Sequence, residues 1–296
     1  MKTNKKNRMD CFQWIMFAVI TIWIASLLFL LGFGFFNSFK YWNDFDRGNV
    51  FGWPSEKYGF VLDNYMTMWV NFHKKIATSS GQRPVYVEEM LFNSLVYATV
   101  MSLVNMSTQL MVAYAVAKFN FKFRNVLYFT AIVVMLIPIV GALPSEMQMA
   151  ESLGLIDNVL GISIMRSKYP GMHFLIFYSM FKGISWTYAE AAQMDGAGHW
   201  RILLSIMMPL VTNVLIGVFI LQFITNWNEY YTPMLFTPSF PTVALGLYSY
   251  DHSSEGYVTT TEKLAACFVT CIPVLVLFII FRNKIMGNLS MGGIKG

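Results

Sequence analysis

The most regular feature of this sequence is a series of long apolar runs separated by polar segments. A helix needs about 20 largely apolar residues to cross a bilayer. Six runs reach or nearly reach this length, and we predict a membrane-spanning helix in each of them: Phe12–Phe36, Leu91–Ala117, Val126–Met149, Val159–Phe181, Leu204–Phe223 and Leu264–Phe281. The fourth run is the least regular, because Arg166, Lys168 and Pro170 interrupt it. Its cleanly apolar part starts only near Met172.

Composition agrees with lipid as the solvent of this chain. Of the 296 residues, 56% are hydrophobic and 12% are charged, whereas a soluble domain has about 25% charged residues. The net charge of +5 is modest, and we see no basic face on a soluble fold of the kind that nucleic-acid binding requires. The first apolar run is longer than the core of a secretory signal and lacks a small-residue cleavage site. We therefore interpret it as a retained span.

The positions of Lys and Arg predict the orientation, because cytoplasmic loops collect positive charge. If the N-terminus lies inside, the inner segments hold these basic residues: Lys2, Lys5, Lys6, Arg8, Lys118, Lys122, Arg124, Lys182, Arg201, Arg282, Lys284 and Lys295. The first outer loop also carries six, but loops of that length count little in this rule. Both termini are therefore expected in the cytoplasm.

A polar segment between the fourth and fifth predicted spans has the features of a surface helix. Thr187 and Glu190 have the T-x-x-E spacing of a capping box, and the residues from Ala189 onward are good helix formers. Gly196 and Gly198 then allow the chain to turn. A short helix of this kind, attached to a span, suits the coupling of a docked cytoplasmic partner to helix tilt. The alternative is a simple amphipathic link between two spans.

The spacing of this segment also carries a resemblance. Glu190-Ala191-Ala192 is followed by three residues, a glycine, nine residues and Ile206-Met207-Met208-Pro209. This pattern resembles the EAA signature of importer permeases of the ATP-binding-cassette (ABC) class. Further similar segments extend over nearly the whole chain: Asn93-Ser94-Leu95, Ala113–Lys118, Met135–Pro138, Leu153–Asn158, Trp227–Tyr230 and the glycine-rich tail Gly287–Gly296. The chain thus resembles carbohydrate-type ABC importer permeases of the maltose-permease kind. Met208 and Ser185 depart from the usual Leu and Pro.

The resemblance implies an all-α integral membrane protein of six transmembrane helices, with a cytoplasmic EAA coupling helix between spans four and five. Its expected parts are a cytoplasmic N-terminus (1–11), the first span (12–36), an outer loop (37–90), the permease core (91–285, with the EAA loop at 186–203) and a cytoplasmic tail (286–296). The implied location is the bacterial inner membrane, crossed several times.

The implied function is the permease subunit of an ATP-driven, binding-protein-dependent importer for a sugar or oligosaccharide. The implied partners are a second permease subunit, a pair of cytoplasmic ATPase subunits and an extracytoplasmic solute-binding protein. The chain has no G-x-x-x-x-G-K-[ST] loop, so we expect it to be no enzyme itself and to need no cofactor. The residues expected to couple to the ATPase are Glu190, Ala191, Ala192, Asp195 and Gly196, and Gly293 and Lys295 of the tail are expected to contact it.

Residues of the substrate path are predicted less sharply. Asn105 and Gln109 lie inside the second span, where they either bond neighbouring helices or line the path. Gln222 and Asn226 lie near the outer end of the fifth span beside aromatic residues, a composition that sugar sites share with interfacial belts.

Arg166 and Lys168 also have two interpretations. Either they form a cationic patch on the path, suited to an acidic sugar, or the span starts later and both face the outer water. The second interpretation is favoured, because a charge at the bilayer centre costs about 2.5–3.5 kcal/mol.

Three other functions compete with a sugar importer, and the least supported is an integral membrane enzyme, because no catalytic set is visible in the sequence. An ABC permease for another small solute fits the EAA segment equally well, but the likeness over the whole chain favours the sugar group. An ion-coupled secondary transporter would need carboxylates within its spans, and here the acidic residues lie in loops and at span ends. The four histidines have no ligand spacing, so no metal site is expected.

Overall fold

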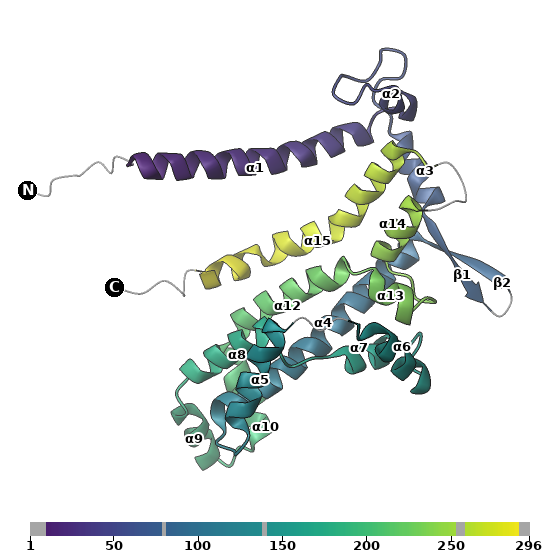
Figure 1. The fold of residues 1–296 in the computed structure, drawn as a ribbon. Helices are drawn as coiled ribbons and strands as arrows, with labels where there is room; N and C mark the ends of the chain where they lie inside the picture. Colours follow the sequence, from purple (N-terminus) through teal and green to yellow (C-terminus); the bar gives the residue numbers. More distant parts are fainter. Residues whose placement is uncertain (1–9, 79–80, 138–140, 253–257, 290–296) are drawn as a thin grey trace, which may run out of the picture. The chain divides into compact units, whose positions relative to one another are not determined.

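Three of the predicted spans are continuous helices in the computed structural model, which describes residues 10–78, 81–137, 141–252 and 258–289 (Figure 1). They are α1 (Cys11–Ser38), α4 (Val87–Lys118) and α15 (Thr260–Leu289). Each contains a stretch long and apolar enough to cross a membrane. The first, second and sixth predicted spans are thus continuous helices of sufficient length, with bounds that extend beyond the apolar runs.

The third and fourth predicted spans are each divided into two shorter helices. The third contains α5 (Arg124–Leu136) and the start of α6 (Leu143–Ser152), and the fourth contains α7 (Val159–Arg166) and most of α8 (Met172–Gly183). In the fourth, the break contains Pro170, which has no backbone N–H to donate to a helix. Helix length within the described residues therefore does not confirm six continuous spans.

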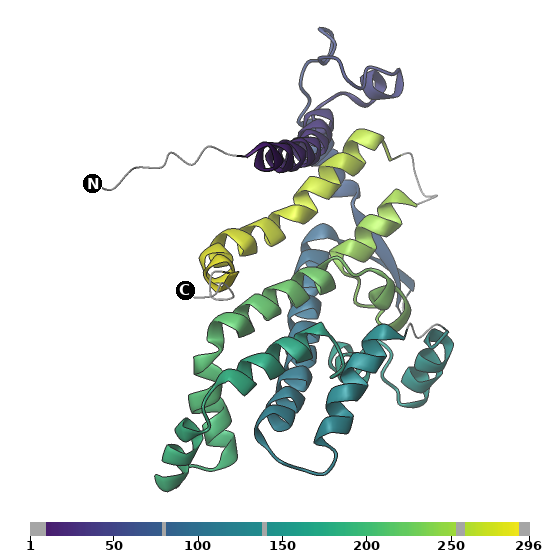
Figure 2. The ribbon, with the colours of Figure 1, turned by 60° about the vertical axis from the view of Figure 1, so that its left-hand side comes forward.

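The fifth predicted span is strongly bent, which corrects the expectation of one straight helix from Leu204 to Phe223. It is made of α10 (His199–Ile202), a π-helical turn η1 (Leu203–Met207), α11 (Met208–Leu210) and α12 (Thr212–Trp227). The part before Val211 meets α12 at 83° (Figure 2). Pro209 cannot donate a backbone bond, and the Thr212 hydroxyl donates to the carbonyls of Met208 at 3.2 Å and Pro209 at 3.0 Å. The count of candidate spans is thus three, or four with this bent pair.

A β-hairpin corrects the all-α expectation in detail. Strands β1 (His73–Thr78) and β2 (Gly81–Tyr86) pair antiparallel, with His73 opposite Tyr86 and Thr78 opposite Gly81. Pro84 is tolerated because both strands of a two-stranded sheet are edges. The remaining elements are all short helices: α2 (Trp42–Asp46), α3 (Asp63–Asn71), α9 (Thr187–Met194), α13 (Tyr231–Phe236) and α14 (Val243–Asp251).

The chain divides into two compact units. One contains the residues up to Phe72 together with Tyr250–Val269, and the other contains His73–Ser249 together with the residues from Thr270. In the first unit, the Asn64 side chain donates to the carbonyls of Ser38 and Lys40, both at 2.8 Å. This pair of bonds fixes the start of α3 against the end of α1.

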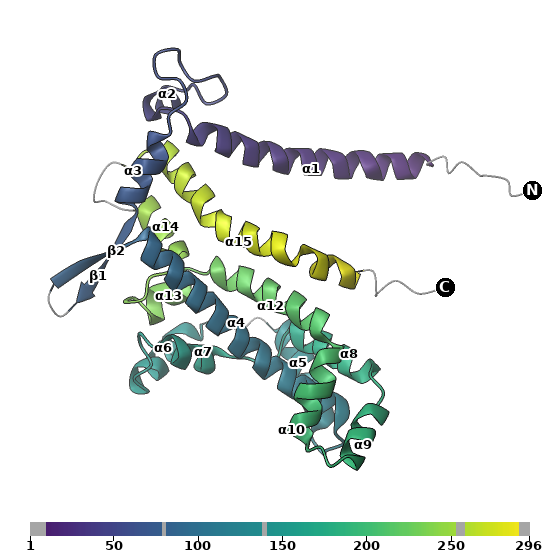
Figure 3. The same cartoon turned by 180° about the vertical axis from the view of Figure 1, so that it is seen from behind.

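The second unit is built around α4. Helices α7, α8 and α12 pack against α4 (Figure 3). The main cluster of buried side chains joins α4, α8, α9 and the bent fifth segment, and the largest of them include Phe174, Phe177, Phe181, Ile202 and Met207. This core positions both the predicted coupling helix and the predicted path residues.

Candidate coupling segment and transport path

The predicted EAA helix is present as α9, and its two sides differ. Ala189 and Ala192 are buried in the main core, whereas Glu190, Ala191 and Asp195 are exposed. Residues three apart lie on one helix face, so the two buried alanines hold the helix against the protein while the acidic residues face away. Of the five predicted coupling residues, Ala192 therefore lies on the face of α9 that packs against the core.

The position of α9 is fixed by the end of α4. The Phe119 ring contacts Trp186 with ring centroids 5.8 Å apart and His199 with centroids 5.3 Å apart, both edge to face. These two partners lie just before and just after the coupling segment. In addition, the Lys118 ammonium donates to the carbonyl of Ile184 at 2.5 Å, which satisfies a carbonyl at the C-terminus of α8.

The start of α9 differs from the predicted capping box. Thr187 is the first helical residue and Trp186 is the N-cap, without a side-chain capping bond. Ser185 instead organises the turn, because its hydroxyl lies 2.9 Å from the Thr187 hydroxyl and accepts from the Thr187 amide at 3.3 Å. The serine that departs from the family pattern therefore makes contacts that a proline lacks.

The end of α9 is a Schellman turn. The Gly196 amide donates to Gln193 and the Ala197 amide donates to Ala192, both at 2.9 Å. Gly196 has φ of 78°, a left-handed conformation that glycine adopts without the penalty of a side chain. The predicted glycine turn is thus confirmed at Gly196.

Three of the predicted path residues make side-chain hydrogen bonds between facing helices. Gln222 on α12 donates to Gln109 on α4 at 3.0 Å, and its amide nitrogen lies 3.2 Å from His173 Nδ1. One α12 turn further along, Asn226 donates to the Ser102 hydroxyl at 2.9 Å. We call Gln109, Gln222 and Asn226, with their partners His173 and Ser102, the amide seam. Both glutamines are buried. Asn105 is half-buried on α4, between Ser102 and Gln109, the two α4 residues that bond α12.

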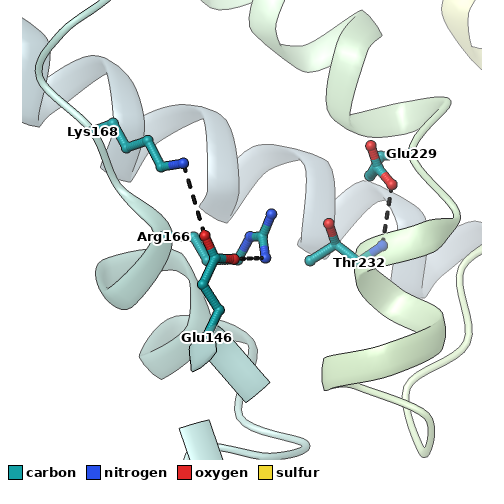
Figure 4. Close-up of polar contacts among 5 residues, drawn as sticks. All are labelled: Glu146, Arg166, Lys168, Glu229 and Thr232. Atoms are coloured by element: carbon teal, nitrogen blue, oxygen red, sulfur yellow. Dashed lines mark hydrogen bonds and ion pairs between the residues drawn. The ribbon is translucent and has the colours of Figure 1, made fainter. Parts of the chain in front are cut away.

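The charged residues of the fourth segment lie around one carboxylate (Figure 4). Arg166 donates to Glu146 of α6 at 2.5 Å, and the Lys168 ammonium lies 3.9 Å from the same carboxylate. The Arg166 and Glu146 side chains are only 25% and 24% exposed, whereas Lys168 is 65% exposed. The Arg166 guanidinium also lies over the Phe236 ring, 5.1 Å from its centroid. We call Glu146, Arg166 and Lys168 the charged cluster.

Three partners in these contacts were missed by the sequence interpretation: Glu146, His173 and Ser102. Glu146 lies 20 residues before Arg166, and no pattern in the sequence relates the two. Glu229, next to these contacts, has a local role. Its carboxylate accepts from the amide of Thr232 at 3.1 Å (Figure 4) and from the amide of Tyr231 at 2.8 Å, and so caps the start of α13.

Other segments of the resemblance have structural roles. Asn93 donates to the Pro241 carbonyl at 3.1 Å, and the Ser94 hydroxyl accepts from the Val243 amide at 2.6 Å. Asp157, with φ of 62°, accepts from the amide and hydroxyl of Ser239. Asn158 caps α7. The predicted tail contacts, Gly293 and Lys295, lie outside the described residues.

A polytopic helical core, an exposed EAA helix on a glycine turn and a bent following segment together define a transport permease. Residues 109–290, more than half of the chain, match the family of the binding-protein-dependent transport system inner membrane component. The chain belongs to this family, and hence is a multi-pass inner-membrane protein that works with a binding protein.

Known relatives agree with this assignment. The chain is 27% identical over 218 residues to the sn-glycerol-3-phosphate transport system permease protein UgpE of Yersinia enterocolitica, covering 73% of this chain and 77% of that one. It is 26% identical over 231 residues to UgpE of Escherichia coli, covering 77% and 79%. Its fold is similar to a chain of a bacterial ABC transporter that imports the acidic polysaccharide alginate, with a TM-score of 0.73, 21% identity and coverage of 92% and 95%.

Proposed function

We propose that this chain is one of two permease subunits of an ATP-driven importer for a sugar or oligosaccharide. The observation that carries the proposal is the outward face of α9. Within the described residues, Glu190 and Asp195 have no ion-pair partner, and Tyr188 and Met194 are 57% and 90% exposed. A mixed acidic and apolar face of this kind suits the groove of a cytoplasmic protein.

The partners of this permease follow from the same proposal. The sequence contains no phosphate-binding loop, so a pair of ATPase subunits in the cytoplasm would supply the energy through α9. Glu190, Ala191, Asp195 and Gly196 form the contact, and Ala192 supports them from beneath. A second permease completes the path, and a solute-binding protein delivers the substrate on the outer side. Both termini then lie in the cytoplasm, as the distribution of basic residues indicates.

The substrate class rests on the relatives and on the charged cluster. The UgpE proteins are named for sn-glycerol-3-phosphate, a phosphorylated polyol. An ion-coupled secondary transporter is disfavoured, because a binding-protein-dependent component needs no ion gradient of its own. A permease for another small solute is the remaining alternative.

A negatively charged carbohydrate is the second candidate within this class. Two cations share one carboxylate in the charged cluster, and Lys168 is exposed with its ammonium 3.9 Å from that carboxylate. Lys168 is thus one exposed positive charge beside the Arg166–Glu146 pair, while the nearby Glu229 carboxylate is engaged by two backbone amides. Such a charge attracts an anionic substrate more than a neutral one.

The coupling proposal is tested with the double variant Glu190→Lys, Gly196→Asp. We expect uptake of labelled sugar by producing cells to be lost, while the amount of protein in the membrane is unchanged. Glu151→Lys is the matched control, since Glu151 is also exposed but belongs to α6. Full transport by the double variant would refute the coupling role of α9.

The substrate proposal is tested with Lys168→Glu. For an anionic sugar, we expect KM to rise about 3- to 10-fold, with no change for a neutral sugar of the same length, because an exposed charge contributes about 1 kcal/mol. Lys57→Glu, an exposed lysine of the first unit, serves as the control. An equal change for both sugars would exclude charge recognition by Lys168.

A further inference from the structure

The segment between α1 and α3 has polar groups inside and aromatic rings outside. The Lys40 side chain is fully buried, whereas Phe51 is 80%, Trp53 76% and Phe60 57% exposed. A loop in water has the reverse arrangement. We call residues 49–60 the aromatic loop.

The polar interior of this segment satisfies its backbone. The Lys40 ammonium donates to the carbonyls of Asn49 and Val50, both at 2.9 Å. The Asn49 side-chain amide donates to the Trp53 carbonyl at 2.8 Å. The Asp44 carboxylate accepts from the backbone N–H of Ser55 at 2.8 Å. Burial lowers the pKa of Lys40, with the Asp44 charge opposing. Satisfied carbonyls matter where water is scarce, because an unpaired backbone group in lipid costs several kcal/mol.

The rings of the aromatic loop contact the last turns of α1. Phe51 lies against Phe33 with ring centroids 5.2 Å apart, and Trp53 and Phe60 lie against Phe36 at 5.5 and 5.8 Å. Figure 1 shows the loop standing out sideways from the end of α1 rather than continuing its axis. A helix of 28 residues is about 42 Å long, longer than the hydrocarbon core of about 30 Å. The helix is therefore long enough for its last turns to reach the membrane–water interface.

We propose that the aromatic loop is an interfacial anchor, which inserts Phe51, Trp53 and Phe60 into the lipid leaflet at the Ser38 end of α1, with Lys40 holding the inserted turn together. This use of the loop is independent of the sugar-importer proposal. It requires only that α1 cross the membrane.

Lipid, rather than a protein, is the partner that fits this surface. No residue in the most apolar stretch of α1 is buried, so this helix offers its sides to lipid. The Phe29 ring stacks on Phe33, which in turn contacts Phe51, and this makes one apolar surface from the span to the loop. Aromatic rings are favoured at the interface. Exposed Arg47 beside the loop and exposed Lys57 within it suit the phosphates of headgroups.

The test uses single cysteines in the full chain, with Cys11, Cys267 and Cys271 replaced by alanine. Phe51→Cys, Trp53→Cys and the control Glu56→Cys, an exposed charged position of the same loop, are treated in the membrane of producing cells with a membrane-impermeant and a lipid-soluble maleimide. We expect positions 51 and 53 to react with the lipid-soluble reagent at least tenfold faster, and position 56 to react with both.

Two results would overturn the proposal. Reaction of positions 51 and 53 with the impermeant reagent would place the loop in water. Reaction with neither reagent before denaturation, but with both after it, would mean that a protein partner covers the loop.

The role of Lys40 is tested in the same assay. Lys40→Met leaves two carbonyls without their donor, so we expect position 51 to become reactive toward the impermeant maleimide. Lys122→Met, at an exposed lysine between α4 and α5, should leave it protected. The amount of protein in the membrane is measured for each variant, to separate local change from loss of folding. Unchanged protection of position 51 in Lys40→Met would refute the part assigned to Lys40.

Discussion

The α9 face and the charged cluster use charge in opposite ways. Glu190 and Asp195 are exposed and have no ion-pair partner among the described residues, whereas Arg166 and Glu146 are three-quarters buried and joined at 2.5 Å. An exposed charge costs little desolvation and remains available to a partner. A buried charge is stable only when it is paired. The difference is consistent with the proposed docking of α9 to another protein, whereas the Arg166–Glu146 pair joins α6 to α7.

The largest effect is expected from the backbone of the coupling segment. Gly196→Val places a β-branched residue at φ of 78°, which costs more than the ~1–2 kcal/mol of a simple side chain in this conformation. A Cβ there would meet no atom within 4 Å, so the strain is purely conformational. We expect uptake to fall at least ~10-fold at equal membrane abundance.

Two controls sharpen that experiment. Gly196→Asn should keep most of the uptake, because asparagine tolerates the left-handed region. Gly183→Val, at a helical glycine with no atom within 4 Å of its Cβ, should have little effect. Normal uptake by Gly196→Val would mean that the turn at the end of α9 is not needed for coupling.

A smaller effect is expected from the charged cluster. We predict a coupling of ~1–3 kcal/mol between Arg166→Met and Glu146→Gln in a double-mutant cycle of unfolding in detergent, because the two groups are largely removed from water. The matched pair is Arg83–Glu89, whose side chains are 57% and 40% exposed. There we expect less than about 1 kcal/mol. Equal coupling in both cycles would remove the distinction between buried and exposed charge.

The amide seam is expected to contribute less than the charged cluster. Gln222→Leu leaves Gln109 without its donor and should lower the free energy of unfolding by ~1–2 kcal/mol. Adding Gln109→Leu should restore part of that loss, since no unpaired amide then remains. Uptake decides the function of the seam: a stable double variant that has lost uptake identifies path residues, and one with full uptake identifies helix contacts.

The smallest effect is expected from the ion pair between exposed Asp251 and half-buried Lys263, whose charged atoms lie 2.9 Å apart. The hydrogen bond from Lys263 holds the pKa of Asp251 below its usual value. The stability from this pair is therefore fully present above about pH 4 and is lost as the pH falls through the lowered pKa. Because Asp251 is exposed, Asp251→Asn should cost less than about 1 kcal/mol at pH 7. Thermal unfolding of both proteins should then converge at acidic pH, and a constant difference would contradict this.

The long helices were predictable because α1, α4 and α15 each follow a long, largely apolar run without a charged residue. The bend at Val211 was not predicted, since it depends on a π-helical turn and on the Thr212 hydroxyl as well as on Pro209. In the site, the spacing from Glu190 to Gly196 predicted both the helix and its turn. The inward face of Ala192 also follows from its position three residues after Ala189, a signal that the sequence interpretation did not use.

Contacts between distant positions were beyond the sequence pattern. Gln109 and Gln222 were each predicted as polar positions on spans, but their hydrogen bond joins residues 113 apart. Glu146 was not considered, although its carboxylate decides whether Arg166 is a free charge. Only the packing of α6 and α7 brings these two groups together.

The bend in the fifth segment has a mechanical consequence. The helical segment His199–Leu210 and α12 meet at 83°, with Val211 at the bend. A rotation about Val211 would therefore move both segments together. Under the proposed coupling, a force across the segment that follows α9 would turn α12 about this point. Asn226 is about 15 residues from the pivot, or ~22 Å along the helix. A rotation of only ~10° would displace it by ~4 Å, more than enough to break its bond to Ser102.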